Sequence, residues 1–137
     1  MKATIDHIGI AVGSLADSLS FFQDALGLEL DHPEEVASQR VHAQFVFTAD
    51  GRDGAKLELL EATAEDSPIA KYVAKRGAGM HHVALRVDDI DAALAELKAR
   101  GVRLIDEAPR PGAHGTRVAF VHPSSTHGVL VELVQRP

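Results

Sequence analysis

Two histidines and two glutamates stand at matching places along the chain and could together bind a divalent metal ion. His7 and His82 are 75 positions apart, and Glu58 and Glu132 are 74 positions apart. Each glutamate interrupts a strongly apolar run, and a carboxylate buried there without a partner is costly. Two imidazoles and two carboxylates around one metal would remove that cost and leave positions open for substrate oxygens. The sequence therefore predicts His7, Glu58, His82 and Glu132 as metal ligands.

Small residues accompany both histidines on their strands. Because side chains alternate between the faces of a strand, His7 shares a face with Gly9 and Ala11, and His82 shares one with Ala84. Small neighbours leave room for a ligand. The same alternation turns His81 away, so a structural role is expected for it. A loop or surface position is expected for the other histidines, which are His32, His42, His114, His122 and His127.

The elements that carry these residues occur twice. Residues 5–30 and 81–104 share one order of signals: a histidine, an alternating strand, a capped amphipathic helix, a glycine and a further strand. Ser14 caps the first helix, and Asp88 or Asp89 caps the second. Both helices carry an apolar stripe, made by Leu15, Leu19, Phe22 and Leu26 in the first and by Ile90, Leu94 and Leu97 in the second. Gly27 and Gly101 end them.

More strands are expected over residues 41–48, 56–61, 116–122 and 129–134, which gives an α+β fold of two tandem βαβββ modules. The predicted organisation is one domain, 1–137, with a first module over 4–62, a connecting helix within 63–79 and a second module over 80–137. Ser67 caps the connecting helix and Pro68 takes its first position. The loop 49–55 is predicted to be a plain hairpin connection, and the loop 109–115 could border a ligand.

Composition narrows the functions that remain. The net charge of −6 disfavours nucleic acid as a partner, and no apolar stretch is long enough to predict a membrane span. The absence of cysteine excludes disulfides and thiolate ligands, so histidine and carboxylates are the strong metal ligands available. The first residues lack the pattern of a signal peptide, and the expected location is cytoplasmic.

Several segments resemble the vicinal oxygen chelate (glyoxalase/bleomycin resistance/dioxygenase) superfamily and, within it, the methylmalonyl-CoA epimerases. The matching segments span residues 6–12, 56–62, 66–90, 112–123 and 128–135, nearly the whole chain. The resemblance implies an open mixed-sheet barrel around a metal site, a homodimer, and an isomerase that interconverts the epimers of an acyl-CoA, methylmalonyl-CoA. It places the metal ligands at His7, Glu58, His82 and Glu132 and favours cobalt, although a His/Glu site also accepts Mn, Ni, Zn or Fe.

Epimerisation needs a proton to leave the carbon alpha to the thioester and another to arrive on the opposite face. Glu132 is the first candidate for a catalytic base, and Glu58 is the candidate for the other side. Some bacterial epimerases place a glutamate where this chain has Ala43, which cannot transfer a proton. His42 and Gln44 are its neighbours, but strand alternation points both of them away from the Ala43 face.

Two alternatives remain at this stage. Glyoxalase-type lyases use similar ligands on a thiol hemithioacetal, and other members of the same fold only bind small molecules. Retention of all four ligand positions favours catalysis, and two carboxylates disfavour ring-cleaving iron dioxygenases. Residues 124–126 replace a Lys-Asp-Cys sequence common in epimerases, so this chain lacks a lysine that could contact the CoA phosphates. Lys71, Lys75 and Arg76 could replace it, although a solvated helix face is favoured for them.

Overall fold

The chain divides into two compact units, and both boundaries along the chain fall within strands. The first unit spans residues 7–81, and the second unit joins residues 1–6 to residues 82–137. Their boundaries lie within β1 (Thr4–Ala11) and β5 (Gly79–Arg86). The computed structural model describes residues 1–48 and 53–137, so the first four residues of the predicted hairpin loop 49–55 lie outside the described residues.

The first unit follows the order strand, helix, three strands, helix. After β1 come α1 (Leu15–Leu19), a π-helix η1 (Ser20–Ala25), β2 (Glu34–Val36), a 3-10 turn η2 (Ala37–Gln39), β3 (Val41–Phe47), β4 (Lys56–Ala62) and α2 (Pro68–Arg76). The strands of this unit are ordered β2-β3-β4-β1. β3 is antiparallel to β2 and β4, whereas β1 is parallel to β4.

The second unit repeats the order of one strand, one helix and three strands. It contains β5, α3 (Ile90–Ala99), β6 (Arg110–Pro111), η4 (Ala113–Gly115), β7 (Arg117–Val121), η5 (Pro123–Ser125) and β8 (Val131–Gln135). Its strands are ordered β5-β8-β7-β6, and β5 is parallel to β8. In both units the strand that carries a histidine is therefore the parallel neighbour of the strand that carries a glutamate. The predicted α+β class and the two βαβββ orders are confirmed.

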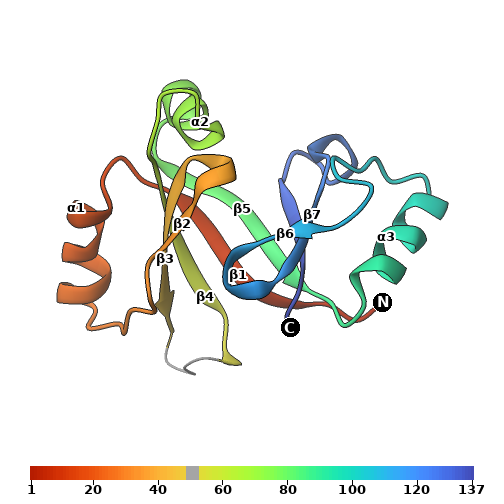
Figure 1. Cartoon of the computed structure of the whole chain (residues 1–137), viewed down its shortest axis with the longest axis horizontal. Helices are drawn as coiled ribbons and strands as arrows, with labels where there is room; N and C mark the ends of the chain where they lie inside the picture. The colour runs from red at the N-terminus through yellow and green to blue at the C-terminus, as the bar shows by residue number, and fades with distance from the viewer. Residues whose placement is uncertain (49–52) are drawn as a thin grey trace. The chain divides into compact units, whose positions relative to one another are not determined.

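Each helix packs on strands of its own unit (Figure 1). α1 and α2 contact β4, and α3 contacts β7 and β8. Ile69 of α2 belongs to a buried cluster with residues of β1, β3 and β4, and Ile90 of α3 belongs to one with residues of β7 and β8. Within the part of the chain that the structure describes, no helix combines the length and the apolar character that a membrane crossing needs.

The helix of the first unit differs from its prediction. α1 ends at Leu19 and continues as the π-helix η1, in which the Leu26 N–H donates to the Phe21 carbonyl, five residues back, at 2.9 Å. The wider winding departs from the 3.6-residue period on which an apolar stripe depends. As a result Leu26, predicted on the stripe, is 52% exposed, whereas α3 is regular and buries Ile90 and Leu94.

The strands predicted directly after the two helix-ending glycines are wrong. Gly27 and Gly101 do adopt positive φ, at 71° and 81°. Beyond them, however, only single bridges form, between Leu30 and Val46 and between Leu104 and Val121. The short strands β2 and β6 form later in the chain instead.

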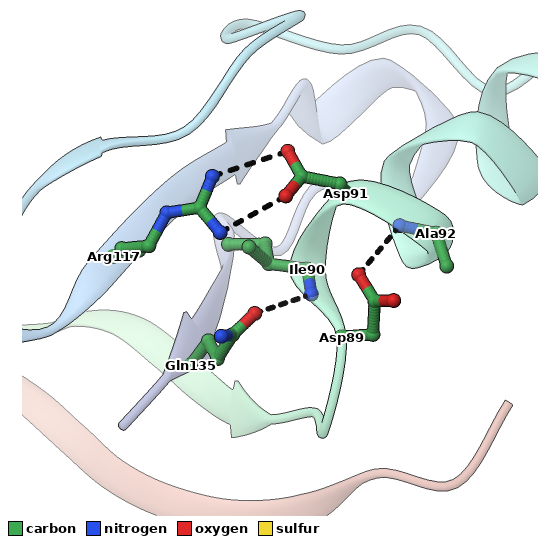
Figure 2. A network of polar contacts seen from close by, with 6 residues as sticks. All are labelled: Asp89, Ile90, Asp91, Ala92, Arg117 and Gln135. Carbon is green, nitrogen blue, oxygen red and sulfur yellow. Dashed lines mark hydrogen bonds and ion pairs between the residues drawn. The ribbon is translucent and has the colours of Figure 1, made fainter. Parts of the chain in front are cut away.

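Polar contacts fix the N-terminus of α3 onto the sheet of the second unit (Figure 2). Of the two predicted caps the structure selects Asp89, whose Oδ1 accepts from the Ala92 N–H at 3.0 Å. The Gln135 side chain on β8 accepts from the Ile90 N–H at 2.8 Å. Arg117 on β7 donates to both carboxylate oxygens of Asp91, and this hydrogen bonding raises the pKa of its guanidinium. The Arg117 guanidinium therefore stays charged at neutral pH.

Ser67 caps α2 as predicted and also ties that helix to a neighbouring turn. Its buried Oγ accepts from the Ile69 N–H at 3.2 Å and donates to the Gln39 carbonyl at 3.1 Å. Pro68 takes the first helical position. A hydroxyl that satisfies one donor and one acceptor in a buried position contributes more than an exposed cap.

Ser67→Ala is therefore expected to lower the free energy of unfolding by about 1–2 kcal/mol, because both partners lose their hydrogen bond. Chemical denaturation followed by circular dichroism measures the change. Ser14→Ala is the matched control, since the Ser14 cap of α1 is an exposed hydrogen bond of 3.2 Å and its loss is expected to cost less. An equal loss in the two variants would contradict the structural role given to Ser67.

Candidate metal centre

His7 and Glu58 form a buried pair in the first unit. β1 and β4 run parallel with Gly9 opposite Glu58, and Gly9 shares a strand face with His7. This register brings His7 Nε2 to 3.3 Å from Glu58 Oε1. The two residues are only 4% and 7% exposed. The imidazole nitrogen and the carboxylate oxygen are thus adjacent and shielded from water.

His82 and Glu132 form the equivalent pair in the second unit. β5 and β8 run parallel with Ala84 opposite Glu132, and Ala84 shares a face with His82. A ligand atom of His82 and one of Glu132 lie within 4.8 Å of each other. Their exposed fractions are 5% and 8%. The repeat seen in the sequence is therefore also a repeat of register: each glutamate stands opposite the residue two positions after a histidine.

A phenylalanine accompanies each pair, and sequence reasoning missed both. Phe45 lies opposite Glu58 in the antiparallel β3–β4 register, and Phe120 lies opposite Glu132 in β7–β8. Phe45 meets His7 edge to face with ring centroids 5.3 Å apart, and Phe120 meets His82 in the same way at 5.8 Å. The two phenylalanines are 75 positions apart, so the period that linked the histidines could have found them.

A cationic side chain lies over each of these rings. Lys56 Nζ is 5.4 Å from the centroid of Phe45, and the guanidinium carbon of Arg110 is 5.5 Å from that of Phe120. Cations at this distance from a ring face are attracted by its quadrupole. Arg110 belongs to the loop that was predicted to border a ligand.

The donor atoms fit a divalent cation. Two ligands in adjacent positions of an octahedral site, each about 2.1 Å from the metal, are about 3.0 Å apart. The 3.3 Å between His7 Nε2 and Glu58 Oε1 is close to that spacing, and a ligand atom of His82 lies within 4.8 Å of one of Glu132. Imidazole nitrogens and carboxylate oxygens suit Co, Mn, Ni, Zn and Fe. Each pair therefore presents half of the predicted ligand set.

The remaining histidines lie outside these pairs. The His81 ring meets Tyr72 edge to face at 4.8 Å, and His122 caps η5 through Nδ1, which accepts from the Ser124 N–H at 3.0 Å. The others are exposed, namely His32, His42, His114 and His127. The surface position predicted for His32 and His42 is confirmed.

Ala43 lies on the strand face that carries Phe45 and stands opposite Leu60, fully buried in an apolar cluster. His42, by contrast, is exposed. The Gln44 side chain donates to the carbonyls of Asp31 and Phe45. Neither neighbour of Ala43 therefore places an acid–base group on the Ala43 face. The basic residues Lys71, Lys75 and Arg76 lie exposed on α2.

The sequence profile of the Glyoxalase/Bleomycin resistance protein/Dioxygenase superfamily matches residues 6–120. The chain belongs to this superfamily. The matched segment contains three of the four predicted metal ligands, His7, Glu58 and His82. Glu132 follows the segment, on β8. The resemblance found in the sequence is confirmed.

Several relatives of the chain are named as epimerases. The chain is 39% identical over 132 residues to the mitochondrial methylmalonyl-CoA epimerase of Bos taurus, covering 96% of this chain and 73% of the relative. It is 36% identical over 137 residues to the ethylmalonyl-CoA/methylmalonyl-CoA epimerase of Cereibacter sphaeroides, covering 98% and 99%. A solved methylmalonyl-CoA epimerase in complex with methylmalonyl-CoA and NH4+ matches at a TM-score of 0.92 and 40% identity, covering 99% of this chain and 96% of that one.

Proposed function

We propose that the chain epimerises methylmalonyl-CoA at the carbon alpha to its thioester, and that the two buried pairs jointly hold one divalent cation. The observation that carries the proposal is the duplicated register, which gives each unit one shielded imidazole and one shielded carboxylate. Two carboxylates balance the charge of a divalent ion, which one pair alone cannot do. Relatives named as methylmalonyl-CoA epimerases, which the chain matches along nearly its full length, support the substrate.

The proposed chemistry is the transfer of a proton to and from carbon. A bound divalent cation supplies electrostatic stabilisation for negative charge that develops on the substrate oxygens. Glu132 accepts the alpha proton, and the electron pair of the broken C–H bond moves into the thioester. Glu58, from the other unit, first takes a proton from solvent and then delivers it to the opposite face of the planar carbon, and the two residues exchange roles for the reverse epimer. The small residues Gly9 and Ala84 keep the faces of the two histidines uncrowded.

The proposed ion, assembly, location and CoA anchor rest on the resemblance to the epimerases and on general chemistry. Cobalt is proposed as the ion, and a homodimer as the assembly. A cytoplasmic location is proposed because acyl-CoA thioesters are made and consumed inside cells. Lys71, Lys75 and Arg76, all exposed on α2, are proposed as an alternative anchor for the CoA phosphates.

Incubation of the cobalt-loaded protein with one epimer of methylmalonyl-CoA in deuterated water tests the function. We expect both epimers to appear, with deuterium at the alpha carbon, because the proton delivered comes from a group that exchanges with solvent. Chiral separation with mass spectrometry measures both quantities, and protein stripped of metal serves as the blank. Turnover of a methylglyoxal hemithioacetal alone would identify a lyase instead, and turnover of neither compound would indicate a binding module.

A further inference from the structure

Arg110 stands next to the metal-ligand pair of the second unit and has no part in the proton transfer proposed above. Its guanidinium carbon lies 5.5 Å from the centroid of Phe120, and the Phe120 ring meets the His82 imidazole at 5.8 Å. One aromatic ring therefore separates a permanent positive charge from a predicted metal ligand. A guanidinium in such a place attracts an anion that approaches the histidine.

The strands and a neighbouring aspartate hold Arg110 in this position. Its backbone pairs with Val118 in the β6–β7 register. Asp106 accepts a hydrogen bond from the Phe120 N–H at 2.8 Å, and the same Oδ2 lies 3.6 Å from Arg110 Nε. Asp106 thereby fixes the backbone of the ring by a hydrogen bond and attracts the guanidinium above it by charge. The position of the charge is preorganised.

The guanidinium still has capacity to bind a ligand. Arg110 Nε is buried without a hydrogen bond, and at 3.6 Å its ion pair with Asp106 is long. The side chain is 40% exposed, so solvent reaches part of it. Guanidinium groups bind carboxylates through two parallel N–H bonds, and such charge-assisted bonds are stronger than neutral ones. A carboxylate ligand is the natural second partner for this group.

We propose that Arg110 binds the free carboxylate of the substrate and so selects malonyl-type acyl-CoA thioesters over those without a carboxylate. The assignment rests on the proposed function for the identity of the thioester, but it concerns recognition and not proton transfer. Malonyl-CoA and propionyl-CoA differ only at the end of the acyl group, where malonyl-CoA has a carboxylate and propionyl-CoA has a methyl group. Their difference in affinity therefore isolates the group that Arg110 would recognise.

The test is calorimetric titration of the cobalt-loaded protein with malonyl-CoA and with propionyl-CoA. In the wild type we expect malonyl-CoA to bind more tightly. In Arg110→Gln we expect that preference to fall by about 10- to 100-fold through weaker binding of malonyl-CoA, with propionyl-CoA unchanged. Arg110→Lys should recover part of the preference because the charge remains while the paired donors are lost. These results would support the assignment.

Arg103→Gln is the matched control, since this exposed arginine of the same unit uses only its backbone in its hydrogen bonds to Ser125 and His122. It removes the same charge and is expected to leave the preference intact. Full retention of the preference in Arg110→Gln, an equal loss for both thioesters, or a wild type that binds neither thioester would overturn the assignment. A wild type that prefers malonyl-CoA through Arg110 but does not epimerise methylmalonyl-CoA would refute the proposed function and leave the assignment standing.

Discussion

Replacing His82 with alanine is expected to reduce bound cobalt from about one ion per chain to almost none, since a site shared by both units loses affinity when either imidazole is removed. His7→Ala should do the same. Elemental analysis of dialysed protein, with protein concentration from amino-acid analysis, gives the ratio. The expected result depends on the two pairs sharing one ion.

The same measurement separates a shared site from two independent ones. If each His–Glu pair held its own ion, the wild type would bind two ions and either variant would keep one. His42→Ala is the control, because His42 is an exposed histidine on β3 and its loss leaves both pairs intact. Retention of one ion after loss of His7 or His82 would refute the four-ligand site.

Glu132→Gln is expected to lower turnover of methylmalonyl-CoA by about 10³-fold or more, because it removes both a metal ligand and a proton acceptor. The change in side-chain volume is small, so the fold should persist and the circular dichroism spectrum should match that of the wild type. Turnover is measured by chiral separation of the epimers. Glu107→Gln provides the control, since Glu107 is exposed and pairs with Lys98 at the surface.

Glu132→Gln and Glu58→Gln together test whether one glutamate works on each face of the substrate. With one base missing, deuterium should still enter the epimer whose alpha proton faces the remaining base, but inversion should stop. The two variants should then label opposite epimers. Wild-type turnover in Glu132→Gln would remove this residue from the mechanism, and labelling of the same epimer in both variants would contradict the assignment of sides.

Signals between near neighbours in the chain were enough to predict many of the elements. The caps at Ser14 and Ser67 depend on hydrogen bonds to residues two or three positions away, and Gly27 and Gly101 end helices through their own backbone conformation. The strands of the histidines and glutamates follow from alternation along a few residues. Each of these features depends on residues that are close together in the chain, so the sequence is enough to predict it.

The π-helix and the short strands could not be predicted in the same way. The sequence of η1 carries an ordinary helical stripe, yet its backbone is wound more widely and leaves Phe21 and Leu26 about half exposed. Likewise the segments after Gly27 and Gly101 have apolar residues suited to a strand but form only single bridges. After Gly27, for example, the backbone of Glu29 and Asp31 bonds to Phe47 and Phe45 on β3, and periodicity along the chain cannot report such contacts.

The sequence by itself determined the repeat, the α+β class and the two His–Glu combinations, because each follows from residue types and intervals along one chain. Only the tertiary structure decided which side chains surround those residues. The parallel register sets His7 beside Glu58, the antiparallel register sets Phe120 beneath Arg110, and Asp89 rather than Asp88 caps α3. The register of two paired strands decides which residues, far apart in the sequence, become neighbours. It depends on how whole strands pack, and no short segment of the sequence contains that information.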